Sequence, residues 1–166
     1  MNKAFVKESG DDDAPVPMPD MPDGVKNYIT PAGHRRLEGE LRKLLAERLA
    51  QQDAVSDGDA RQRDQRVQYL QTRLDAADVV DPALHVGNDQ VFFGAMVTYE
   101  HADGERQTIT IVGLDELDPA HGLISWLSPV AQSLLGAEVG DVVMLEGPAG
   151  DEELTIIDVR YPSPEN

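Results

Sequence analysis

The chain has 166 residues, 40% of them hydrophobic, which allows one ordinary domain or two small ones with a buried core. It contains no cysteine, which excludes disulfides, thiol catalysis and cysteine-based metal sites. Its net charge of −17 disfavours general nucleic-acid binding, because such binding requires a basic face. No segment approaches the roughly 18 apolar residues of a membrane span, and residues 1–13 lack an apolar signal core, so we expect a cytoplasmic protein with no membrane partner.

The charges are distributed unevenly along the chain. Residues 30–81 hold 9 basic and 10 acidic side chains, whereas residues 82–166 hold 2 basic and 15 acidic ones. This division suggests two modules with different partners. Residues 1–25 combine an acidic run with closely spaced prolines, and we interpret them as a disordered tail.

Residues 26–81 are predicted to form an antiparallel helical hairpin. Thr30 is a favourable N-cap, and Pro31 suits the first helical position, where no backbone N–H is needed. A narrow apolar stripe follows at Leu37, Leu41, Leu44 and Leu45.

A second helix, capped by Ser56 or Asp57, is predicted after a polar turn. Its apolar residues alternate at spacings of three and four, as in a coiled-coil seam: Val67, Leu70, Leu74 and Ala77. The turn and its flanks, residues 51–59, are the predicted hairpin tip.

Residues 82–166 are predicted to form a small, mostly antiparallel sheet with one short helix. Five segments favour β-branched and aromatic residues: 90–100, 106–114, 122–126, 142–145 and 154–159. Asp103-Gly104 and residues 147–150 indicate turns. Ser128 is the expected cap of the helix, with Pro129 at its first position and Gly136 after its end. The fold class is therefore α+β.

The sequence contains no catalytic signature of its own. The four histidines are not paired at metal-ligand spacing, and no glycine-rich phosphate loop occurs. Asp115-Glu116 falls in a predicted loop and is interpreted as a solvated turn. We expect no enzyme activity and no cofactor of its own.

Acidic residues meet at the predicted tip, with basic residues behind them. Asp53, Asp57 and Asp59 either serve the turn or coordinate a hard cation such as Mg²⁺ in a partner's site. The arginines behind the tip are Arg61, Arg63 and Arg66. They suit phosphates, or alternatively pair with acids of the facing helix.

Short motifs over about 135 residues, from about Val25 to Tyr161, carry a resemblance. The matching pieces are Tyr28–Gly33, Arg63–Leu70, Val91–Ala95, Ile111–Gly113 with Asp115–Glu116, Ser128–Pro129, Leu134–Gly136, Val139–Asp141 and Pro148–Gly150. Together, and in this order, they resemble the GreA/GreB transcription elongation factors, GreB more closely.

The resemblance implies an FKBP-like C-terminal domain, residues 82–166, that docks on bacterial RNA polymerase at its secondary channel. It implies that Ser128 and Pro129 lie on the docking loop; Trp126 and Leu127, which we count with them as polymerase-binding candidates, stand where relatives often have a polar or acidic residue, so a more apolar docking contact is expected. It also implies that the coiled coil enters the channel, where tip acids share a catalytic Mg²⁺ with the polymerase near the nascent RNA.

Two further features, both in the hairpin, depart from the family pattern. The family's tip motif is degenerate here, because Gly58-Asp59 is followed by Ala60-Arg61-Gln62 without the usual Ser-Glu-Asn. The hairpin is also about 18 residues short, which removes about nine residues per arm, or roughly 13 Å of reach. We therefore expect transcript-cleavage stimulation to be weak or lost.

Three alternatives stay open at this point. The chain is a fully active cleavage factor that uses Asp57 and Asp59, or a non-cleaving polymerase-binding competitor similar to Rnk. A more remote alternative is an FKBP-type prolyl isomerase, although residues 82–166 offer few aromatic residues for its pocket.

Overall fold

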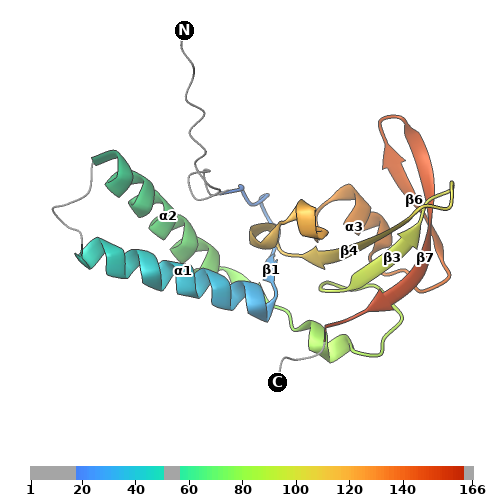
Figure 1. The fold of residues 1–166 in the computed structure, drawn as a ribbon, viewed down its shortest axis with the longest axis horizontal. Coiled ribbons are helices and arrows are strands. Elements are labelled where there is room, and N and C mark those ends of the chain that lie inside the picture. Colours follow the sequence, from blue (N-terminus) through green and yellow to red (C-terminus); the bar gives the residue numbers. More distant parts are fainter. Residues whose placement is uncertain (1–17, 51–56, 163–166) are drawn as a thin grey trace, which may run out of the picture.

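The computed structural model describes residues 18–50 and 57–162, which form a helical hairpin beside a curled sheet (Figure 1). The helices are α1 (Pro31–Ala50), α2 (Asp57–Asp75) and α3 (Pro129–Leu134). The strands are β1 (Asn27–Ile29), β2 (Ala77–Val79), β3 (Met96–Glu100), β4 (Arg106–Val112), β5 (Leu123–Ser125), β6 (Val142–Gly147) and β7 (Gly150–Arg160). Within these described ranges there are also the short 3-10 helices η2 (Pro82–His85), η3 (Leu114–Glu116) and η4 (Pro119–His121).

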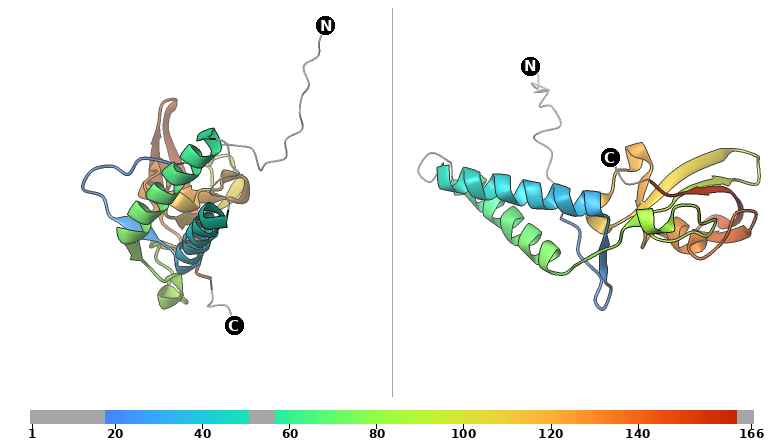
Figure 2. Two further views of the ribbon diagram at one scale, coloured as in Figure 1. Left: turned by 90° about the vertical axis from the view of Figure 1, so that its left-hand side faces the viewer. Right: turned by 90° about the horizontal axis from the view of Figure 1, so that it is seen from below.

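The hairpin projects from the sheet. Figure 2 shows α1 and α2 at one end of the long axis and the five-stranded sheet at the other. The seam between the helices is apolar, with Leu37, Val67 and Leu70 buried. The predicted helical hairpin is therefore confirmed, while its connecting residues 51–56 lie outside the described part of the chain.

A two-stranded parallel sheet closes the base of the hairpin. β1 precedes α1 and β2 follows α2, and Asn27 pairs with Ala77 in their register. Ile29 is buried in the hairpin core with Leu37 and Leu70. Neither strand was predicted from the sequence, because three residues are too few to show a period-two pattern.

The larger sheet has the strand order β5-β4-β3-β7-β6. Only the β4–β5 pair is parallel, so the predicted mostly antiparallel sheet is confirmed. Both predicted turns are present: Gly104 (φ +90°) lies in the β3–β4 turn, and Gly150 (φ +117°) begins β7 directly after the β6–β7 turn. A positive φ is readily adopted by glycine, which explains its place at these turns.

The short helix α3 packs on this sheet as expected. The Ser128 hydroxyl accepts a hydrogen bond from Ala131 N at 3.3 Å, which confirms it as the cap. The strand predicted from residue 90 begins later, at Met96. Gly94 (φ +90°) bends the preceding residues, which leaves Gln90 only an isolated bridge to Glu138.

The structure describes the last residues of the predicted tail. Residues 18–25 have definite contacts, and the Pro19 carbonyl accepts hydrogen bonds from α2. Residues 1–17 lie outside the described chain, and the disordered tail over residues 1–25 stays a prediction. Within the described residues, no helix has the length and apolar character that crossing a membrane requires.

Candidate functional site

The hairpin tip is described only in part. Asp57 is the first residue of α2, and Asp59 is exposed in its first turn. Asp53 lies outside the described residues. In the described ranges, no group of three or more potential metal ligands is brought together. Metal binding by the three tip acids stays a prediction.

The arginines behind the tip differ in their surroundings. Arg66 binds Glu40 of the facing helix through two contacts, 2.7 Å from Nε and 3.0 Å from Nη2. The Arg63 side chain is mostly covered, with its Nε 3.9 Å from Asp64, whereas Arg61 is exposed. For Arg66 the structure favours the alternative of ion pairing within the hairpin.

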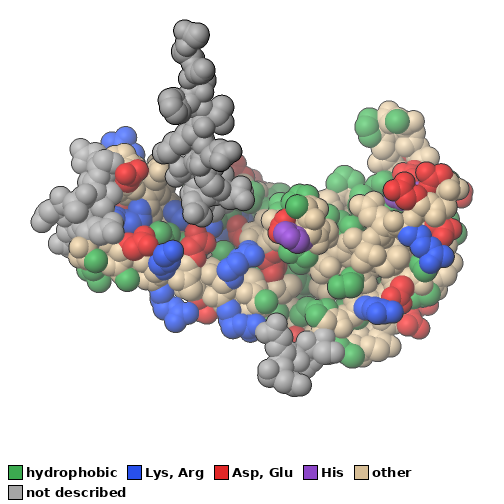
Figure 3. Space-filling model, in the orientation of Figure 1, with side chains coloured by type: hydrophobic (Ala, Val, Ile, Leu, Met, Phe, Trp, Pro, Cys, Tyr) green, Lys and Arg blue, Asp and Glu red, His purple; other side chains and the backbone are tan. Residues whose placement is uncertain are grey.

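Charged side chains are distributed as unevenly over the surface as they are along the sequence. On the face shown in Figure 3, most Lys and Arg side chains lie over the hairpin, while Asp and Glu dominate over the sheet. The same protein thus presents two surfaces of different electrostatic character.

The loop of residues 126–129 lies next to the base of the hairpin. The Trp126 ring packs edge-on against Tyr28, with centroids 4.9 Å apart. Ser128 caps α3, and Leu127 N donates to the Ser125 hydroxyl at 3.0 Å. Pro129 is exposed. The four residues are therefore brought together, but their docking role stays a prediction.

A carboxylate that the sequence analysis placed on the surface is buried. Glu116 is 5% exposed. Its carboxylate accepts hydrogen bonds from Thr30 N at 3.1 Å, from Gly113 N at 2.8 Å and from the Thr30 hydroxyl. The solvated-turn interpretation of Asp115-Glu116 is wrong, because both side chains are enclosed by the base of the hairpin.

Asp115 binds the second helix in the same way. Its side chain is 4% exposed, accepts a hydrogen bond from the Tyr69 hydroxyl and lies 3.7 Å from Arg73 Nε. Its backbone oxygen accepts from Arg36 Nη2 at 2.7 Å. Burial, together with the hydrogen bond to Asp115, raises the pKa of Tyr69. We call Thr30, Tyr69, Arg73, Asp115 and Glu116 the hairpin–sheet joint.

The joint connects both helices to one turn of the sheet module. Glu116 binds the start of α1, and Asp115 binds the last turns of α2. Hydrogen bonds to a buried carboxylate are strong and directional. The direction of the hairpin relative to the sheet is therefore set by specific polar contacts in addition to apolar packing.

Comparison with known proteins places this architecture in a family. Residues 86–161 match the family described as transcription elongation factor, GreA/GreB, C-term. The transcription elongation factor GreB of Neisseria meningitidis serogroup A is 43% identical over 155 residues, which cover 82% of this chain and 95% of the relative. The chain belongs to the GreA/GreB family of transcription elongation factors.

Two further similarities span the chain. The GreA of Desulfovibrio desulfuricans is 38% identical over 156 residues, covering 83% of this chain and 96% of that protein. The solved structure of GreA/GreB from Nitrosomonas europaea is 28% identical and covers 82% of this chain and all of that one, with a TM-score of 0.41.

The alignment with this GreB relative also carries a length difference. The two sequences align over 155 positions, but 82% of this chain is only about 136 residues. At about 19 aligned positions, therefore, the relative has a residue and this chain has none. A deficit of this size agrees with the shortening expected from the motif spacing.

Proposed function

We propose that this GreA/GreB family member binds bacterial RNA polymerase and regulates transcript elongation. The observation that supports this function best is the projecting hairpin of α1 and α2, held in a fixed direction by the joint. A rigid helical hairpin beside a separate docking surface is suited to insertion into a channel of a large partner. This function places the protein in the cytoplasm and assigns it no reaction of its own.

The docking surface in this proposal is the loop of residues 126–129. Trp126 lies against Tyr28 at the base of the hairpin, so contact with this loop also fixes where the hairpin points. Pro129 is exposed, whereas the Ser128 hydroxyl is engaged in capping α3. We expect the apolar parts of the loop to contribute more to binding than its hydroxyl.

The hairpin is too short, in our proposal, to stimulate transcript cleavage strongly. α1 and α2 have 20 and 19 residues, which correspond to helices of about 30 Å at 1.5 Å per residue. A loss of about nine residues per arm removes roughly 13 Å. Since catalytic groups lose much of their effect when misplaced by about 1 Å, the tip acids should not assist the polymerase's Mg²⁺.

Binding and cleavage are measured on the same stalled, backtracked elongation complexes. The proposal predicts saturable binding of the chain with little shortening of the nascent RNA. The absence of binding at low salt would reject the function. Rapid RNA shortening would reject the claim that the hairpin is too short to stimulate cleavage, but it would not contradict polymerase binding.

A second candidate retains full cleavage activity through Asp57 and Asp59. It is supported by their position at the start of α2, beside the hairpin turn. The variant Asp57→Ala/Asp59→Ala distinguishes the candidates, because it abolishes RNA shortening only if these acids act. Arg61→Ala tests the nascent-RNA contact, since this arginine is exposed whereas Arg66 is bound to Glu40.

A further inference from the structure

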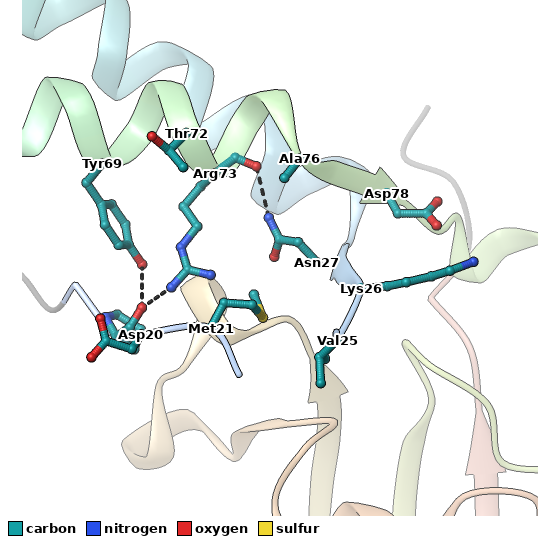
Figure 4. A pocket seen from close by; sticks show the side chains of 11 residues that line it. Asp20, Met21, Val25, Lys26, Asn27, Tyr69, Thr72, Arg73, Ala76 and Asp78 are labelled. Atoms are coloured by element: carbon teal, nitrogen blue, oxygen red, sulfur yellow. Dashed lines mark hydrogen bonds between the residues drawn. The ribbon is translucent and has the colours of Figure 1, made fainter. Parts of the chain in front are cut away.

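A segment outside the family-like stretch lies across the joint. Residues 18–24, which we call the strap, precede Val25, where the family motifs begin. The Pro19 carbonyl accepts a hydrogen bond from Arg73 Nη2 and lies 3.4 Å from the Tyr69 hydroxyl, whose single hydrogen it shares with Asp115. In Figure 4 the dashed lines from the labelled Tyr69 and Arg73 side chains meet at one oxygen beside Asp20. The strap therefore binds the same two residues that hold Asp115.

The strap completes the surroundings of a buried charge. Arg73 is 6% exposed, and its Nε lies 3.7 Å from an Asp115 oxygen that has no hydrogen-bond partner among the described residues. A buried guanidinium with unsatisfied donors is costly, and the cost falls when a carbonyl accepts from it. The carbonyl of Pro19 supplies this acceptor.

The strap also walls a pocket of about 500 Å³ over α2. Pro19, Asp20 and Met21 form one side, and Tyr69, Thr72 and Arg73 are among the residues of the other. Without the strap this side would be open to water. Water competes for the donors of Arg73 and weakens its attraction to Asp115 by raising the local dielectric constant.

The strap is stiff and anchored at one end. Pro19 and Pro22 restrict the backbone, so that less conformational entropy is lost when the segment is ordered. Val25 N donates to Pro22 O at 3.3 Å, and β1 follows directly. Asn27 of β1 donates to the backbone oxygen of Arg73 at 2.9 Å, which ties this end of the strap to α2.

We propose that the strap positions the hairpin relative to the sheet by closing the Tyr69–Arg73–Asp115 side of the joint. Glu116 holds α1 independently of the strap. Loss of the strap therefore weakens mainly the contact of Asp115 with α2. The strap acts on the orientation of two parts of one chain, so its role does not depend on polymerase binding.

Spin labels report this orientation, because the chain has no cysteine that would react elsewhere. Ala46→Cys on α1 and Ala102→Cys in the β3–β4 turn are exposed and give one distance between the modules. Pulsed electron paramagnetic resonance is recorded for the full chain, for a deletion of residues 1–17 that keeps the strap, and for a deletion of residues 1–22 that removes most of it.

The full chain and the shorter deletion should give the same narrow distance distribution. The longer deletion should give one at least about twofold broader, since modules without a fixed interface move relative to each other. An unchanged distribution would overturn the proposal. A second label pair, Ala46→Cys with Gln62→Cys, reports on the hairpin alone. If that distance also changes, the strap acts on hairpin folding and the positioning role is rejected.

Discussion

The carboxylate of Glu116 accepts a hydrogen bond from the backbone N–H of Thr30 at 3.1 Å, across 86 positions of sequence. Thr30 also caps α1, because its hydroxyl accepts from Gly33 N at 3.1 Å. An anion at a helix N-terminus is favoured by the unpaired N–H groups and the helix dipole. One contact thus starts the first helix and attaches it to the sheet module.

Gly33→Ala should destabilise the protein by about 2 kcal/mol or more, because a Cβ at this position overlaps the Glu116 carboxylate. Gly39→Ala is the matched control in the same helix. Nothing lies within 4 Å of its added Cβ, so it should stabilise the helix by about 1 kcal/mol. Urea unfolding measures both. Equal effects of the two substitutions would contradict the close packing of Glu116 on α1.

Glu116→Gln should cost about 2 kcal/mol, although the shape of the side chain is kept. The carboxylate accepts from three donors, and an amide nitrogen cannot replace an accepting oxygen. Glu153→Gln on the exposed part of β7 is the control and should be nearly neutral. A joint variant as stable as the control would show that this carboxylate contributes little.

The pair Arg66–Glu40 should show a coupling of about 1 kcal/mol in a double-mutant cycle, since it is bidentate and partly covered. The more exposed pair Arg48–Asp64, at 3.7 Å, should show a coupling of about 0.3 kcal/mol or less. Thermal unfolding at two salt concentrations measures both cycles. A coupling of zero for Arg66–Glu40 would return Arg66 to the candidates for phosphate binding.

His101 should make stability depend on pH. Its hydrogen bond to Glu152, the main cause, raises the pKa of the imidazole above its ordinary value of 6.5. The stabilisation that the charged His101–Glu152 pair gives the folded state is therefore complete below pH 6.5, and it is lost as the pH rises through the raised pKa of His101. His101→Gln should lower the urea midpoint at about pH 6 and change it little at about pH 9. A deficit that is larger at the higher pH would contradict this pairing.

Local signals in the sequence predicted much of the fold. Thr30-Pro31 marks the start of α1 and Ser128-Pro129 the start of α3, because cap chemistry depends on neighbouring residues alone. The hairpin seam followed from the spacing of its leucines. The strands β1 and β2 were missed because each has only three residues and is stabilised by pairing over 50 positions.

The joint was not predictable from the same signals. A buried glutamate and a solvated one look alike in sequence, and the partners of Glu116 and Asp115 lie 86 and 46 positions away. The family motifs did include Asp115-Glu116 and Tyr69, but a motif match does not indicate burial. The contact of Arg66 with Glu40 was one of two open alternatives, since an arginine suits phosphate and carboxylate equally well.

Binding to bacterial core RNA polymerase at low salt, followed by fluorescence anisotropy of the labelled chain, tests the central claim most directly. We predict saturable binding that an unlabelled GreB displaces and that Trp126→Ala weakens. No association, or association that GreB fails to displace, would contradict the proposal that this projecting hairpin and its neighbouring loop engage the polymerase as a GreA/GreB factor.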